Sequence, residues 1–189
     1  MRLVIDLQGA QGGSRLRGIG RLSRELALAM AKEAGHHEVL VALNGAFPDS
    51  IDDLTAAFAG ILSRDAMRVW YPAGRTAAIE PDSDLRLRAT EHIRARFLRS
   101  LVPDLVHVSS LFEGIDDDVV TSLPANVFAL PGAATLYDLI PLIRRDQYLD
   151  GAWIGAPVRA WYLRMVEELR RMPGLLAISE SSRDRKSVV

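Results

Sequence analysis

Cysteine is absent from this 189-residue sequence, which excludes disulfides and thiolate metal sites. Histidine is scarce as well, with four residues spread along the chain except for the pair His36 and His37, so we expect no metal site. No apolar run approaches the roughly 18 residues of a membrane-spanning helix. The first apolar segment contains Asp6 and does not have the pattern of a signal peptide. These absences predict a cytoplasmic protein.

An excess of charge of either sign is also lacking. The formal net charge is -1 at pH 7, so the overall balance gives no reason to expect binding to nucleic acid. Lysine occurs only as Lys32 and Lys186, and the other 21 basic residues are arginines. Hydrophobic residues make up 49% and charged residues 25%, which is typical of a soluble globular protein. The length suits one domain with a substantial core.

What the sequence does contain is a regular alternation of strand and helix patterns. Short segments rich in Val, Ile and Leu predict strands at residues 3–7, 37–43, 68–71, 103–110, 126–130 together with 133–138, and 175–179. Helical spacing predicts helices at 19–32, 49–62, 82–101 and 153–172, and helix starts are expected at 116–118 and 180–182. Such alternation predicts an α/β fold: a Rossmann-like, mostly parallel sheet with helices on both faces.

The predicted helix at 82–101 carries five arginines, for which the two interpretations are a solvated charged face and a basic binding surface. We expect an apolar face made of Leu85, Ile93, Phe97 and Leu101. The arginines of this segment are then expected mostly on solvated faces, namely Arg86, Arg88, Arg94, Arg96 and Arg99.

The glycine-rich stretch after the first strand is the main candidate site. A strand, a flexible turn and a helix in this order suit phosphate binding, because glycine lets the backbone approach and a helix N-terminus offers free N–H groups. The candidates are Gly12, Gly13, Gly18 and Gly20, with Arg15, Arg17 and Arg21 beside them. The stretch is neither a Walker A loop nor a G-x-G-x-x-G fingerprint. A simple turn between strand and helix remains the other interpretation.

Polar residues also follow the fourth predicted strand. Ser109, Ser110 and Glu113 are site candidates because ligands of open α/β sheets bind at the carboxyl ends of strands. We expect His107 to be a core residue of this strand. The run 116–118 consists of three aspartates, but consecutive residues converge poorly on one metal ion, so we predict a helix N-terminus there.

Tyr137 and Asp138 end the next predicted strand, where polar side chains are well placed to contact a ligand. For Asp138 there is a second interpretation, in which its carboxylate caps the following turn.

Four stretches together resemble the N-terminal domain of a family 4 glycosyltransferase, of the retaining GT-B class and the bacterial mannosyltransferase-like branch. They are Ile5-Asp6-Leu7-Gln8-Gly9 with Arg17-Gly18-Ile19-Gly20-Arg21, then 103–109, then 135–142, and finally 176–183. They occur in the family's order and cover nearly the whole chain. The family often has His-Asp where this sequence has Tyr137-Asp138.

The resemblance implies a two-domain enzyme that moves a sugar, such as mannose, from a nucleotide sugar to a glycan or lipid-linked acceptor in bacterial polysaccharide or O-antigen synthesis. Residues 1–183 would be the N-terminal, acceptor-side domain and 184–189 an atypical tail. The resemblance further implies that the C-terminal donor-binding domain would lie outside these residues and would be their docking partner, and we expect the fragment to be inactive alone. The donor would be GDP-mannose or a similar substrate, with no cofactor, and peripheral association with the inner face of the membrane is expected.

Carried onto this sequence, the resemblance assigns catalytic positions to Tyr137 and Asp138. It assigns donor-phosphate or acceptor contacts to Gly12, Gly13, Arg17, Gly18, Gly20, Arg21, Ser109 and Glu113, and no residue to a metal. The competing hypothesis is a non-catalytic Rossmann-type module for ligand binding or protein interaction. A nucleotide-dependent oxidoreductase is disfavoured because the G-x-G-x-x-G spacing is missing.

Overall fold

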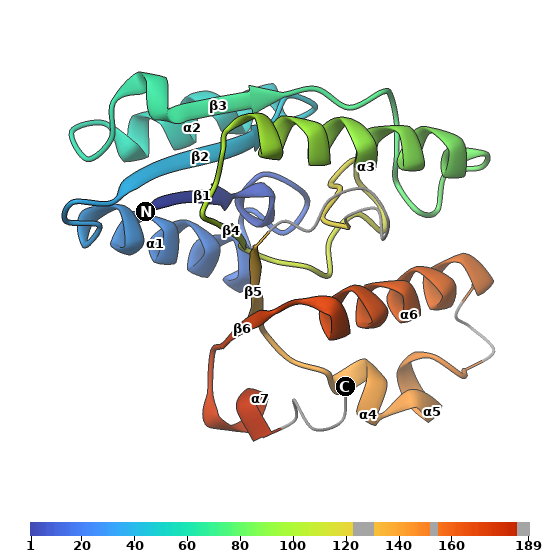
Figure 1. Cartoon of the computed structure of the whole chain (residues 1–189). Coiled ribbons are helices and arrows are strands. Elements are labelled where there is room, and N and C mark those ends of the chain that lie inside the picture. The colour runs from blue at the N-terminus through green and yellow to red at the C-terminus, as the bar shows by residue number, and fades with distance from the viewer. Residues whose placement is uncertain (123–130, 152–154, 185–189) are drawn as a thin grey trace.

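Six parallel strands form one sheet in the computed structural model, which describes residues 1–122, 131–151 and 155–184 (Figure 1). The strand order is β3-β2-β1-β4-β5-β6. Every neighbouring pair is parallel, and β1 pairs with both β2 and β4. The strands are β1 (Arg2–Asp6), β2 (Glu38–Asn44), β3 (Met67–Trp70), β4 (Leu105–Val108), β5 (Gly132–Leu136) and β6 (Gly174–Ala177). The predicted Rossmann-like sheet is confirmed.

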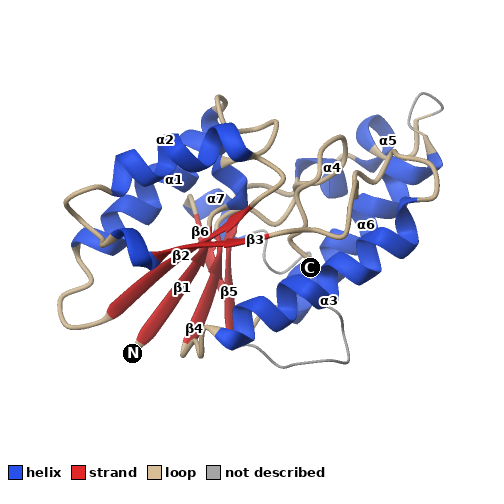
Figure 2. Cartoon of the chain, turned by 90° about the horizontal axis from the view of Figure 1, so that it is seen from above, coloured by secondary structure: helices blue, strands red, loops and turns tan. Residues whose placement is uncertain are grey.

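Helices cover both faces of this sheet (Figure 2). Helices α1 and α2 lie on one face, and α3 and α6 lie on the other. The longer helices are α1 (Gly18–Lys32), α2 (Pro48–Phe58), α3 (Ser83–Ser100) and α6 (Ala156–Arg171). Shorter ones are η1 (Gln8–Ala10), η2 (Arg64–Ala66), α4 (Ile140–Ile143), α5 (Arg145–Tyr148) and α7 (Glu180–Asp184). This two-sided cover follows from right-handed crossovers on either side of β1.

The core is divided by the sheet. On the α1 side, Ile5, Val41 and Leu43 pack with Ala27 and Phe58. On the opposite face two clusters form, one around Val4 and Leu98 and the other around Val108 and Leu169. Alternate residues of one strand thus serve opposite layers, as expected for a sheet buried on both faces.

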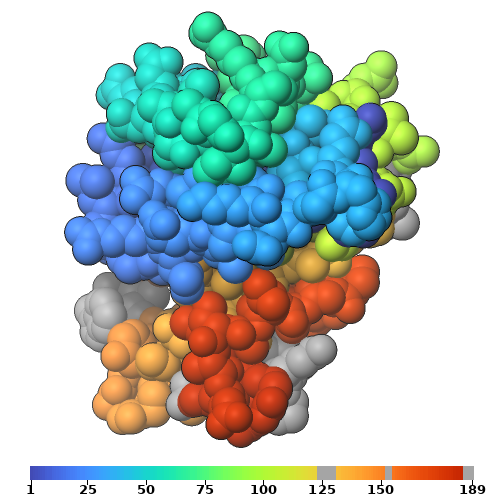
Figure 3. All heavy atoms as spheres, turned by 90° about the vertical axis from the view of Figure 1, so that its left-hand side faces the viewer, coloured from blue at the N-terminus to red at the C-terminus, as the bar shows by residue number. Residues whose placement is uncertain are grey.

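The edge strand β6 and helix α7 lie below α1 and β2 when the molecule is viewed from the amino ends of the strands (Figure 3). The side chains of Leu176 and Ile178 are nearly half exposed there. Among the described residues, no helix is long and apolar enough to cross a membrane.

Two predictions about local structure are wrong. Residues 116–118 form bends rather than a helix start, because two of these aspartates accept hydrogen bonds from other loops, as described below. The predicted apolar face of α3 is rotated, since Leu85 is 79% and Ile93 is 40% exposed. Instead Arg94 is fully buried, where its charge is neutralised by Asp6.

Parts of three other predictions lie outside the described residues. These are the strand segment 126–130, the first residues of the helix predicted at 153–172, and 185–189 of the predicted tail. Helix α7 continues through Asp184.

Candidate functional site

The carboxyl ends of β1, β4 and β5 bring the predicted site segments together. The strand order reverses between β1 and β4, and ligands of open α/β sheets bind at such a reversal. The glycine-rich loop follows β1, residues 109–122 follow β4, and Tyr137 follows β5 directly. Segments more than 100 positions apart in the sequence therefore meet at one edge of the sheet.

The glycine-rich loop is held by the acidic run. The Gly13 amide donates a hydrogen bond to Oδ2 of Asp117 at 2.7 Å, and the Val119 amide donates to Oδ1 at 3.1 Å. Burial raises the pKa of Asp117, while these two hydrogen bonds act in the opposite direction. The neighbouring Asp118 accepts a hydrogen bond from the Thr76 amide at 2.7 Å. The aspartates thus connect separate loops. Asp117 accepts the hydrogen bond of the Gly13 amide, which was a candidate for phosphate binding.

The glycines of the loop differ in their surroundings. A side chain on Gly12 would overlap Asp117 and Val119, and one on Gly20 would overlap the backbone of Ser14 and Arg15. A side chain on Gly18 would meet nothing within 4 Å. Gly12 and Gly20 are therefore needed for close packing, whereas Gly18, the first residue of α1, leaves open space at the helix N-terminus.

Serine hydroxyls surround a buried carboxyl group beneath this loop. Ser110 donates to Oε1 of Glu113 at 2.8 Å. Burial raises the pKa of Glu113, hydrogen bonds from Ser110 and Ser14 oppose that shift, and the nearby Asp117 adds to it. Ser109 is also buried, and its hydroxyl accepts a hydrogen bond from the Gly9 amide at 3.3 Å. The predicted Ser109 and Glu113 thus lie within the same cluster as the glycine loop.

Tyr137 joins β5 to the N-terminal part of α1. Its hydroxyl lies 2.9 Å from that of Ser23 and donates to the carbonyl of Ile19 at 3.2 Å. Burial raises the pKa of Tyr137, so the phenol is protonated at neutral pH. The adjacent Asp138 is exposed and accepts a hydrogen bond from the Ile140 amide at 3.0 Å, which is the turn-capping interpretation.

Arginines of the loop and of α1 line a pocket whose lining does not include Ser109 or Ser110. Arg15, Arg21 and Arg24 line a pocket of about 250 Å³ between the start of α1 and α2, where Ser50 and Asp53 form part of the opposite wall. Arg17 is exposed at the N-cap position of α1. The structure therefore separates a cationic pocket from the Ser–Glu–Tyr cluster.

A buried polar network under the loop was not predicted. Nε of Arg94 donates to Oδ2 of Asp6 at 2.7 Å, and both side chains are fully buried. Gln8 donates to both carboxylate oxygens of Asp6, at 3.1 and 3.2 Å, and accepts a hydrogen bond from Asn44 at 2.9 Å. Gln11 accepts a hydrogen bond from the Asn44 amide at 2.7 Å. This network fixes the carboxyl ends of β1 and β2. Its one signal in the sequence was a charged residue, Asp6, inside the apolar pattern of β1.

His107 is a core residue, as predicted. It is 3% exposed on β4, and its Nε2 lies 3.0 Å from the Thr135 hydroxyl. Burial lowers the pKa of His107 to about 4, with Asp6 acting in the opposite direction. Among the residues that the structure describes, no group of three or more His, Asp or Glu side chains is arranged to hold a metal ion.

Comparison with known proteins gives one consistent relationship. A serotype-specific mannosyltransferase WbdA from Escherichia coli is 33% identical over 184 residues, which cover 96% of this chain and 21% of that protein. The chain is homologous to one segment of WbdA. Two further WbdA sequences from Escherichia coli are 30% identical over 159 residues, or 83% of this chain and 19% of theirs. The chain thus spans about a fifth of the length of these WbdA relatives.

No protein-family model matches the chain. Among solved structures, that of Arabidopsis thaliana UGT89C1 complexed with UDP aligns with a TM-score of 0.48 and 12% identity, covering 94% of this chain and 42% of that one. The relationship to WbdA therefore rests on sequence.

Proposed function

We propose that this chain is the N-terminal, acceptor-side half of a two-domain GT-B glycosyltransferase. The complete enzyme moves a sugar from a nucleotide sugar to a glycan or lipid-linked acceptor, and by analogy with the relatives that sugar is mannose. The observation that carries the proposal is 33% identity to a mannosyltransferase along 96% of the chain. The convergence of Gly13, Glu113 and Tyr137 at the strand-order reversal supports it.

The glycine loop and the start of α1 contact the donor's diphosphate in this proposal. The leaving diphosphate gains negative charge as the bond to the sugar breaks, in an oxocarbenium-like transition state. The N-terminal N–H groups of α1 and the exposed Arg17 stabilise that charge. Arg21 contributes from the pocket beside α2. Asp117 releases the Gly13 amide when the anion arrives, because both cannot accept its single hydrogen.

Tyr137 acts as a neutral hydrogen-bond donor to the sugar rather than as a base, and its hydroxyl hydrogen turns from the Ile19 carbonyl to the sugar when the substrate binds. Its pKa is raised by burial, which keeps the phenol protonated at the pH of the reaction. The exposed carboxylate of Asp138 accepts hydrogen bonds from sugar hydroxyl groups. Ser109 and Glu113 hold the glycine loop and the acceptor side of the cluster.

The partner and substrate assignments belong to the same proposal. A C-terminal domain carries most of the nucleotide-sugar site, with GDP-mannose or a similar donor and no further cofactor. The protein works at the inner face of the membrane when its acceptor is lipid-linked.

The test is a transfer assay with radiolabelled GDP-mannose. Residues 1–189 are assayed alone and in a chimera in which they replace the homologous segment of an Escherichia coli WbdA. We expect no transfer by the chain alone. We expect the chimera to transfer more mannose than a WbdA that lacks the homologous segment. Transfer by the chain alone contradicts its being a half-enzyme. A folded but inactive chimera favours the non-catalytic Rossmann-type module.

A further inference from the structure

A groove lies between the N-terminal end of α3, together with the loop before it, and the first half of α6. These two helices run side by side with their N-termini at the same end of the molecule (Figure 1). The groove has a volume of about 640 Å³, within the range of small-molecule sites. Its lining includes Asp82, Asp84, Leu85, Leu87, Trp161 and Arg164.

We propose that this groove holds the non-reacting sugar units of an acceptor oligosaccharide, with Trp161 as the residue on which a pyranose ring stacks. The proposal rests on the proposed function and names an acceptor subsite for it. Trp161 packs on the cluster of Leu149, Tyr162 and Val166, which fixes the indole, and it also lines the groove. An indole offers a broad apolar face to the C–H groups of a sugar ring at low cost in conformational entropy.

The groove adjoins the candidate site. Leu87, Trp161 and Arg164 also line a narrow cleft whose other wall includes Glu113 and Gly114. Glu113 belongs to the serine–carboxyl cluster at the ends of β4 and β5. Sugars lying in the groove would therefore lie beside that cluster, separated from it by this cleft of about 10 Å³.

The charges of the groove favour an uncharged ligand over a phosphorylated one. Arg164 is paired with the buried Glu91, and Glu80 is paired with Arg75 at 2.6 Å. Asp84 is exposed and has no hydrogen-bond or ion-pair partner among the described residues. Carboxylates accept hydrogen bonds from sugar hydroxyls, whereas they repel a diphosphate. The groove thus suits the acceptor and not the nucleotide sugar.

The test is titration of residues 1–189 with mannotriose, followed by calorimetry and by tryptophan fluorescence. We expect saturable binding that Trp161→Ala weakens about tenfold or more and Asp84→Asn weakens several-fold. Trp161→Phe retains most of the affinity because it keeps an aromatic face. Tyr71→Ala is the matched control and leaves the affinity unchanged. Tyr71 directly follows β3, is 67% exposed and does not line the groove.

Three results would overturn this inference. The first is no saturable binding up to about 10 mM sugar, and the second is full affinity in a Trp161→Ala variant that circular dichroism shows to be folded. The third is tighter binding of tetralysine, a cationic probe of the groove's carboxylates, than of mannotriose. Because Asp84 is exposed, its variant tests the groove even where Trp161→Ala disturbs packing. This binding is measured without turnover, so a negative result in the transfer assay does not change it. Conversely, absence of sugar binding in the groove does not contradict the proposed transferase function.

Discussion

The amide of Gly13 donates its hydrogen bond to Asp117 at 2.7 Å, across 104 positions of sequence. In the mechanism we propose, this carboxylate occupies the position that the incoming phosphate takes. Asp117→Asn removes that competing charge, so we expect residues 1–189 to bind inorganic pyrophosphate about five- to tenfold more tightly, measured by calorimetry or NMR titration. Asp116→Asn is the matched control, because it removes the same charge from an exposed neighbour that does not contact Gly13. Weaker binding in Asp117→Asn, or equal effects of the two variants, would contradict a phosphate role for this amide.

Gly18 and Gly20 differ in how closely they are packed, so replacing each by alanine should change stability differently. Gly20→Ala is expected to cost about 1–3 kcal/mol of the free energy of unfolding, because the new methyl overlaps the Ser14 and Arg15 backbone. Gly18→Ala is expected to be neutral or to stabilise by up to about 1 kcal/mol, since its methyl group meets open space at a helical position. Urea unfolding of the two variants measures the difference, and equal effects would mean that the loop is not packed on α1 as described.

The buried pair of Arg94 and Asp6 predicts an asymmetric response to mutation. Arg94→Met leaves the Asp6 carboxylate buried without its cation, and we expect a loss of about 3–5 kcal/mol in the free energy of unfolding. Arg96→Met, on the exposed side of the same helix, is expected to change it by less than about 0.5 kcal/mol. Adding Asp6→Asn to Arg94→Met should recover part of the loss. Chemical denaturation of the three variants decides, and a small effect of Arg94→Met alone would contradict the burial of the pair.

His107 predicts how stability depends on pH. Burial lowers its pKa from 6.5 to about 4, so the unfolded chain takes up a proton that the native protein resists. Stability from this residue is present above pH 6.5 and is lost as the pH falls toward 4, by up to about 3 kcal/mol. The buried Glu113 and the half-buried Asp117, whose pKa values are raised, act in the opposite direction.

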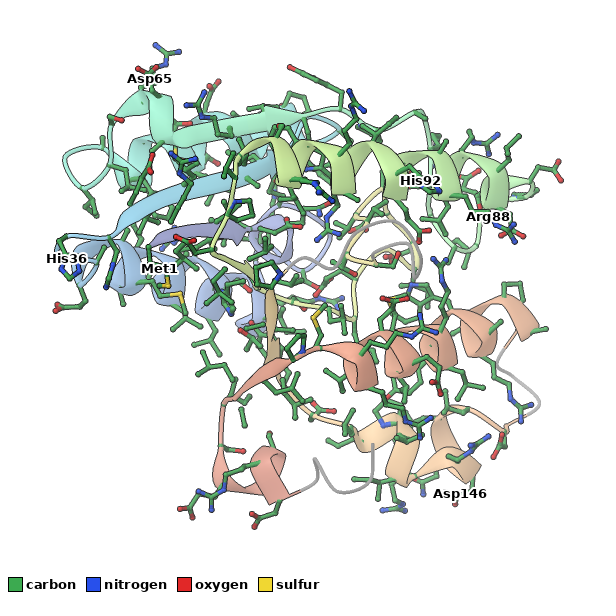
Figure 4. All side chains as sticks on the ribbon, in the orientation of Figure 1. Met1, His36, Asp65, Arg88, His92 and Asp146 are labelled. Atoms are coloured by element: carbon green, nitrogen blue, oxygen red, sulfur yellow. The ribbon has the colours of Figure 1, made fainter. Side chains whose placement is uncertain are left out.

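Comparison with a variant therefore isolates the histidine. The difference in unfolding free energy between wild type and His107→Gln should shrink between pH 7 and pH 4.5, whereas His92→Gln, exposed on α3 (Figure 4), should show no such trend. A pH-independent difference for His107→Gln would contradict the lowered pKa.

Much of the fold could be predicted from the sequence, because strands buried on both faces give continuous apolar runs and the turns carry glycine or proline. That the residues after β1, β4 and β5 lie close together was predictable for the same reason, since their position after parallel strands places them at one edge of the sheet. The phase of α3 was not, because the buried charge of Arg94 is neutralised by Asp6, which lies 88 positions earlier in the sequence. The acidic run was misassigned because its partners, Gly13 and Thr76, are remote in sequence.

The most direct measurement is the rate of mannosyl transfer from GDP-mannose by the WbdA chimera that carries residues 1–189. We expect transfer by the chimera, with kcat/KM about tenfold lower for Arg17→Ala and for Tyr137→Phe and unchanged for Arg96→Ala. A folded chimera without transfer, or equal kcat/KM values in all of these variants, would contradict the assignment of this sheet edge as one wall of a sugar-transfer site.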